Sequence, residues 1–190
     1  MSRAYRITVK ESDTRHLKAG DEISTRLEVL EILSPEDMAT LLRNELKERG
    51  FEEQEDGTLV RRDGDVSVTV DPCSGEVSVK ADAEQTVSQE ANREATGFND
   101  IGPNQESLRE RVKDQLKQDL DKKFEQEQSR LQTEATRRLE QHLQEIQPEI
   151  SEVVNKVTRD ALKQKAQQMG TVKEISEDAE SGSLTIKLEV

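Results

Sequence analysis

Alternation of apolar and polar residues predicts β-strands at the start of the chain. Tyr5, Ile7 and Val9 alternate with polar residues, which is the two-residue period of a strand with one buried face. The charged stretch 10–25 that follows is interpreted as a loop, because it is too long for a tight hairpin. Residues 26–33 carry apolar side chains on both faces, and this pattern predicts a central strand or a strand with a bulge.

The segment Ser34-Pro-Glu-Asp37 is typical of a helix start. Ser34 can accept a hydrogen bond from a free backbone amide, proline fits the first helical position, and the two acids suit the positive end of the helix dipole. Gly50 fits the residue just after a helix end. One apolar stripe lies between these signals, at the spacing of a helix face: Met38, Leu41, Leu42 and Leu46.

Two short alternating runs predict a β-hairpin after this helix. They cover residues 58–62 and 65–70 and flank Asp63-Gly64, a dipeptide typical of type I′ turns. A further strand is expected after the turn at 71–75. One helix against about five strands indicates an α+β fold, with a small two-layer α/β sandwich as a docking module over residues 1–81.

A long helical region is expected in the second half of the chain. Residues 82–104 have little hydrophobic pattern and are interpreted as a linker with turn chemistry at 97–103. Ser107-Leu-Arg-Glu110 has the pattern of a capping box, and the helical region is placed at residues 105–169. An apolar stripe runs along it in steps of mostly four residues, so it is coiled-coil-like but drifts from a strict heptad seam. These are the candidate interaction residues: Leu108, Val112, Leu116, Leu120, Phe124, Leu131, Leu139, Leu143 and Ile146.

Pro148 is predicted to break the helical region, either as a kink or as the start of a second helix over 149–168. The stripe needs a partner, because an isolated long helix leaves it exposed. An internal helical hairpin and pairing between chains are both open. Residues 170–190 then predict a C-terminal β-hairpin, which is too small to be stable alone. It must join the N-terminal sheet, lie on the helices or pair with another copy.

Composition excludes several classes of function. The 190 residues are 36% charged and 31% apolar, with a net charge of −13. This acidic balance argues against nucleic-acid binding, which needs clustered Lys and Arg. No apolar run approaches the roughly 18 residues that a membrane-spanning helix needs. One cysteine and the absence of a signal-peptide core lead us to expect a cytoplasmic protein.

Candidate catalytic and metal-binding residues lack the partners that such chemistry requires. His16 and His142 have no Cys or second His at metal-ligand spacing. Cys73 lies close to Asp71, whereas a reactive thiolate needs cationic neighbours. The acidic run 52–56 lacks the ligand spacing of an EF-hand loop. We therefore expect no enzymatic activity, no metal and no cofactor.

Three stretches carry a resemblance to a known family. They are Arg3-Ala-Tyr-Arg-Ile-Thr-Val9, the stretch from Ser24 to Met38, and Asp65-Val-Ser-Val-Thr-Val-Asp-Pro-Cys-Ser-Gly-Glu-Val-Ser-Val79. They resemble small bacterial proteins encoded beside an AAA ATPase (FtsH-like or MoxR-like) and a von Willebrand A-domain protein, in so-called ternary systems. The resemblance implies an accessory or client component of an ATPase-driven assembly, and it carries no catalytic residue.

The leading hypothesis is a non-enzymatic accessory or assembly protein that acts through protein–protein contacts. Its expected partners are an AAA ATPase and a von Willebrand A-domain protein, with homo-oligomers also considered. The alternative is a self-assembling structural protein whose helices form an oligomeric rod. An enzyme that uses Cys73 or the acidic loops ranks third.

Overall fold

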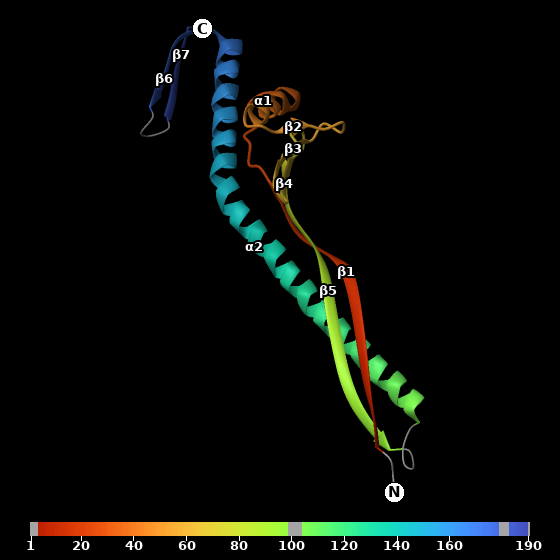
Figure 1. Ribbon diagram of the computed structural model, residues 1–190. Coiled ribbons are helices and arrows are strands. Elements are labelled where there is room, and N and C mark those ends of the chain that lie inside the picture. The colour runs from red at the N-terminus through yellow and green to blue at the C-terminus, as the bar shows by residue number, and fades with distance from the viewer. Residues whose placement is uncertain (1–3, 99–103, 179–182, 190) are drawn as a thin grey trace. The chain divides into compact units, whose positions relative to one another are not determined.

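The computed structural model describes residues 4–98, 104–178 and 183–189, and it contains both helices and sheets (Figure 1). The α+β class expected from the sequence is confirmed. The elements in chain order are β1 (Ala4–Arg26), α1 (Pro35–Glu48), β2 (Glu52–Glu53), β3 (Leu59–Asp63), β4 (Val66–Val70), β5 (Glu76–Phe98), α2 (Gln105–Met169), β6 (Thr171–Asp178) and β7 (Ser183–Glu189).

The chain forms two compact units, and each is assembled from segments that are distant in the sequence. The ribbon unit contains residues 1–20 and 82–136, and the sandwich unit contains residues 21–81 and 137–190. The sequence suggested four consecutive segments instead. β1, β5 and α2 each contribute one part to each unit, so the two units are described separately.

β1 and β5 are each a continuous strand of 23 residues. The loop expected at 10–25 is therefore wrong, and so is the linker expected at 82–104 as far as Phe98; residues 99–103 lie outside the described part of the chain. Both stretches were misassigned because most of their inward positions hold alanine, glutamine or charged residues, and Leu17 and Val87 are isolated apolar residues among them. Alternation between two polar faces gives no hydrophobic signal.

In the ribbon unit, the first part of α2 packs across one face of the two strands. Ile7 and Val9 of β1 contact Val112 and Leu116 of α2. Two smaller clusters continue this layer along the helix. They are formed by Val87, Leu120 and Phe124, and by Ala83, Leu131 and Ala135.

In the sandwich unit, one sheet packs against α1 and the second part of α2. The five strands are ordered β1-β5-β4-β3-β2, and β4 pairs antiparallel with both β3 and β5. Alternate residues of β4 are buried, as the sequence predicts. Fully buried members of this core include Leu46 of α1, Val68 and Val70 of β4, and Val153 and Val157 of α2.

Helix α1 forms as predicted. The Ser34 hydroxyl accepts a hydrogen bond from the Asp37 amide at 3.2 Å, and Pro35 occupies the first helical position. Gly50 follows the C-cap with a φ of +83°, a conformation that glycine adopts without steric cost. Local capping chemistry is therefore enough to fix both ends of this helix.

Two local predictions in the sandwich unit are wrong. Residues 27–33 form no strand; Leu27 and Leu33 are buried within an irregular connection, which explains their apolar character. In the hairpin, Asp63 pairs with Val66, so the turn residues are Gly64 and Asp65 rather than Asp63 and Gly64. Only Gly64 has a positive φ there, as a type II′ turn requires.

Helix α2 starts two residues before the predicted capping box, at Gln105, and continues through Pro148. Its cap is Asn104, whose side-chain oxygen accepts a hydrogen bond from the Ser107 amide at 2.8 Å. The helix is continuous there, so a separate helix over 149–168 does not occur, and the alternative of a kink at Pro148 stays a prediction. Proline removes one helical hydrogen bond, and the burial of Ile146 and Val153 on either side of it offsets that loss.

The C-terminal hairpin is present as predicted. β6 and β7 pair antiparallel, with an irregularity between Val172 and Glu174. Among the described residues they form a two-stranded sheet of their own rather than an extension of the five-stranded sheet.

Candidate interaction surfaces

The apolar stripe of α2 is buried within its own chain. The side chains of Leu116, Leu120 and Phe124 are at most 3% exposed in the ribbon unit, and Val112 and Leu131 are also buried there. In the sandwich unit Leu139 and Ile146 are buried, whereas Leu108 and Leu143 are half-buried in their respective units. The stripe thus packs against strands and the short helix α1, and not against a helix formed by residues 149–168. A role in binding another protein stays a prediction, and it would require those elements to leave the helix.

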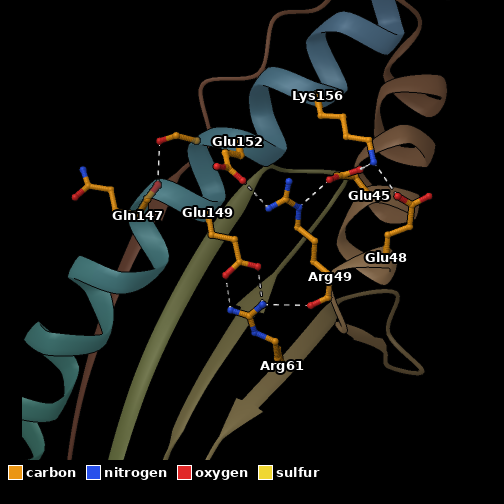
Figure 2. A network of polar contacts seen from close by, with 9 residues as sticks. Glu45, Glu48, Arg49, Arg61, Gln147, Glu149, Glu152 and Lys156 are labelled. Carbon is orange, nitrogen blue, oxygen red and sulfur yellow. Dashed lines mark hydrogen bonds and ion pairs between the residues drawn. The ribbon is translucent and has the colours of Figure 1, made fainter. Parts of the chain in front are cut away.

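A two-pronged ion pair fastens α2 to β3 inside the sandwich unit (Figure 2). Both terminal nitrogens of Arg61 donate to the Glu149 carboxylate, at 2.6 and 2.8 Å. Arg61 also donates to the Arg49 carbonyl and lies over the Phe51 ring, 4.7 Å from its centre. Such planar, two-bond pairing fixes geometry more tightly than a single ion pair does.

A second group of charges joins α2 to α1. Glu45 is only 5% exposed, and its carboxylate contacts both Lys156 and the Arg49 Nε, the latter at 2.7 Å. Lys156 also contacts Glu48 at 2.8 Å, and Arg49 contacts Glu152 at 3.2 Å. Figure 2 shows these side chains converging from the two helices.

The carboxylates of this network are held in their ionised form. Hydrogen bonding to Arg61 lowers the pKa of Glu149, against a smaller opposing effect of burial. Burial alone would raise the pKa of Glu45, but the hydrogen bonds from Lys156 and Arg49 outweigh it and lower the pKa. Such groups are poor proton donors near neutral pH. The network is therefore suited to fixing α2 on the module rather than to acid–base chemistry.

The sequence did not indicate this network. Its members lie about a hundred residues apart, since Glu152 is 103 residues from Arg49. Each residue taken alone looks like an ordinary charge on a solvated helix or strand. Only the packing of α2 on α1 and β3 brings them together.

The other candidates from the sequence lie apart from one another. The His16 Nδ1 is 3.1 Å from the Thr86 hydroxyl, and its Nε2 is 3.4 Å from Glu84. His142 has Glu145 as a neighbour, at 3.8 Å. Cys73 is exposed in its turn. Within the described ranges, no three His, Cys, Asp or Glu side chains converge as a metal site requires.

The acidic run 52–56 begins with the short strand β2 and continues into a turn. Glu53 pairs with Lys47 at 2.6 Å and with Arg43 at 3.0 Å, and the bond to Lys47 lowers its pKa. Asp56 accepts from the Thr58 hydroxyl and amide, so it stabilises the turn. These acids hold local structure together.

The ribbon unit presents two long strand edges. β1 has β5 on one side and, among the described residues, no strand on the other. β5 pairs with β4 only as far as Ala81, so in the part of the chain that the structure describes its later residues have β1 as their only neighbouring strand. Side chains of α2 reach the backbone of β1: Gln128 and Gln132 donate to the carbonyls of Lys18 and Gly20.

A comparison with family models gives one match. The model described as FtsH ternary system domain X5 matches residues 1–190, which is the whole chain. The chain belongs to this family. No curated protein and no solved structure matches it.

Membership of the FtsH ternary system domain X5 family confirms one part of the resemblance seen in the sequence, the association with an FtsH-containing system. A component of such a system has protein partners, so its surfaces are the relevant functional features. In the part of the chain described, no helix is both long and apolar enough to cross a lipid bilayer.

Proposed function

We propose that this protein is a non-enzymatic accessory component of an ATPase-driven assembly and that it acts by docking to other proteins. The family match over the whole chain carries the proposal, because the family is described by its FtsH ternary system. The partners are then an FtsH-like AAA ATPase and a von Willebrand A-domain protein, and the location is cytoplasmic.

The arrangement of the side chains supports a docking role. The charged groups of the network around Arg61 and Glu45 pair with one another, and hydrogen bonding lowers the pKa of Glu45 and of Glu149. Most of the apolar stripe is covered by the chain itself. Polar faces and strand edges therefore remain as the surfaces on which partners bind.

The alternative, an oligomeric rod made by the helices, requires the stripe to contact other copies. Leu116 is 1% exposed and Phe124 is 2% exposed beneath the strands of the ribbon unit. A rod would have to displace those strands and lose the contacts that bury both side chains. The docking role needs no such rearrangement.

Isolation of the tagged protein at native level from its own cells tests the proposal, with mass spectrometry of what accompanies it in the presence and absence of trapped ATP. We expect an FtsH-like ATPase and an A-domain protein in the eluate. Recovery of the protein alone, in large particles, would instead establish the structural alternative.

A pair of variants makes this test specific to the folded ribbon unit. Leu120→Asp places a charge at a position that is 3% exposed, whereas Gln118→Asp places the same charge on the exposed side of α2. Loss of the ATPase with Leu120→Asp but not with Gln118→Asp is the expected result. Equal recovery with both variants would show that docking does not need this unit.

A further inference from the structure

The C-terminal hairpin is a two-stranded sheet with one apolar face. On this face Val172, Leu184 and Ile186 are half-buried, and Ile175 is 42% exposed. Among the described residues, none of these four belongs to a hydrophobic cluster of either unit. A hairpin of two strands is marginally stable at best by itself. The sheet therefore gains stability from a further strand.

The two edges of the hairpin differ in how they are protected. β6 contains a bulge between Val172 and Glu174, with Lys173 as the extra residue. A bulge and charged residues of this kind prevent strand addition at an edge. β7 contains neither a bulge nor a proline, and its even-numbered positions carry no charged residue. Among the described residues it has β6 on one side and no strand on the other. The edge of β7 is therefore the one open to a further strand.

The pattern of residue types in β7 is the same in both directions. The strand Ser183-Leu-Thr-Ile-Lys-Leu-Glu189 alternates polar and apolar residues symmetrically about Ile186. Two copies of β7 that pair antiparallel about Ile186 place apolar residues opposite apolar ones and polar residues opposite polar ones along the whole strand. Antiparallel pairing of a strand with itself is also the arrangement that a two-fold axis generates. The pattern thus favours a second copy of the chain as the source of the added strand.

The charges of β7 are compatible with this register. Lys187 lies opposite Thr185 of the second copy, so no two like charges are directly opposite. A register centred on Lys187 would place two lysines opposite each other, and one centred on Thr185 would shorten the pairing. In the register centred on Ile186 the two Lys187 residues are diagonal neighbours, and each already contacts Glu174 of its own hairpin at 2.5 Å. That contact reduces the repulsion between them.

We propose that β7 pairs antiparallel with β7 of a second copy, centred on Ile186, and forms a four-stranded sheet across a two-fold axis. Backbone groups at the edge supply the hydrogen bonds, as in other cases of strand addition. The apolar faces of the two hairpins join into one face. A strand of seven residues forms a small interface, so we expect a weak dimer with a Kd of about 10–100 µM.

Cross-linking of the full chain tests the register. Cys73 is the single cysteine and is exposed, so the experiment starts from Cys73→Ser. Ile186→Cys then places two thiols at the axis, where the Cα atoms of opposite residues are about 4.5–5.5 Å apart, within the range of a disulfide. Ile175→Cys is the control, because Ile175 pairs with Ile186 in the hairpin but lies one strand farther from the axis. We expect a disulfide-linked dimer after oxidation of Ile186→Cys, and monomer for Ile175→Cys.

Sedimentation equilibrium of the chain without added cysteines measures the strength of the pairing, over concentrations from about 1 to 500 µM. Thr185→Lys sets like charges opposite each other at Lys187 and should weaken the dimer about five-fold, whereas Thr185→Glu should strengthen it about five-fold. Ser176→Lys is the control, because it adds the same charge directly across the hairpin from Thr185, on β6. It should leave the Kd unchanged. Circular dichroism of each variant checks that the fold is kept.

Several results would overturn the inference. A monomer at every concentration would show that the edge does not pair. Equal cross-linking of Ile186→Cys and Ile175→Cys would show that the hairpins stack face to face, and equal weakening by Thr185→Lys and Ser176→Lys would place the contact elsewhere. The inference does not rest on the accessory role, and none of these results alters the co-isolation experiment, so the two proposals can fail separately.

Discussion

The ion pair between Arg61 and Glu149 gives the most direct test of how α2 is held in the sandwich unit. We consider Arg61→Met, Glu149→Gln and the double variant. The first removes the guanidinium but keeps much of its apolar stem, and the second keeps the shape of the side chain without its charge. Together with the unaltered protein they form a double-mutant cycle, which isolates the energy of the pair.

The expected magnitude follows from the geometry. Arg61→Met removes two charge-assisted hydrogen bonds to Glu149, one bond to the Arg49 carbonyl and the stacking on Phe51. Hydrogen bonds to charged groups contribute about 1.5–3 kcal/mol, and the cation–π contact adds about 0.5–1 kcal/mol. The two side chains remain 25% and 27% exposed, so solvent screens part of the attraction. We therefore expect a destabilisation of about 2 kcal/mol and a coupling energy of about 1 kcal/mol.

Urea unfolding followed by far-ultraviolet circular dichroism measures these free energies, since the chain contains no tryptophan for fluorescence. Amide exchange of α1 and β3 then assigns the transition to the sandwich unit. The control is the longer and more exposed pair Asp160 and Lys163 on α2, 3.7 Å apart, for which a coupling below about 0.5 kcal/mol is expected. Equal coupling energies for the two pairs would refute the reasoning.

Three further predictions test other parts of the fold. Folding lowers the pKa of Glu149 and that of Glu45 below the ordinary value of 4.5. Each ionised carboxylate therefore stabilises the fold fully above pH 4.5. This stabilisation is lost as the pH falls below 4.5 and through the lowered pKa. The free energy of unfolding should accordingly decline below about pH 5, and it should decline less steeply in Glu149→Gln. An equally steep decline in that variant would show that Glu149 does not contribute to the pH dependence. Pro148→Ala should raise the free energy of unfolding by about 1–3 kcal/mol in urea titrations, because it restores a helical donor, and a destabilised variant would show that the proline is needed in α2. Leu120→Asp should abolish hydrogen-exchange protection of the strands in the ribbon unit, because it buries an unpaired charge. Gln118→Asp should leave this protection unchanged. Retained protection in Leu120→Asp would argue against the packing of α2 on β5.

Local chemistry allowed several elements to be predicted from the sequence alone. Ser34, Pro35 and Gly50 determine where α1 begins and ends, because capping involves residues within a few positions of one another. The alternation in β4 and the C-terminal hairpin have the same local character. The end of α2 before Gly170 belongs with them, since glycine commonly follows a helix terminus.

Tertiary structure decided the rest, because the forces involved act between residues that are far apart in the chain. The strand character of residues 10–25 and 82–98 depends on pairing between β1 and β5 and on the cover of α2, since few of their inward positions are large and apolar. The continuity of α2 through Pro148 depends on the burial of its neighbours. The partner of the apolar stripe proved to be strands and α1 of the same chain, an outcome that a helical period by itself cannot distinguish from helix pairing. The network around Arg61 and Glu45 cannot be predicted from local sequence, since its charged side chains interact only when packing brings them within hydrogen-bonding distance.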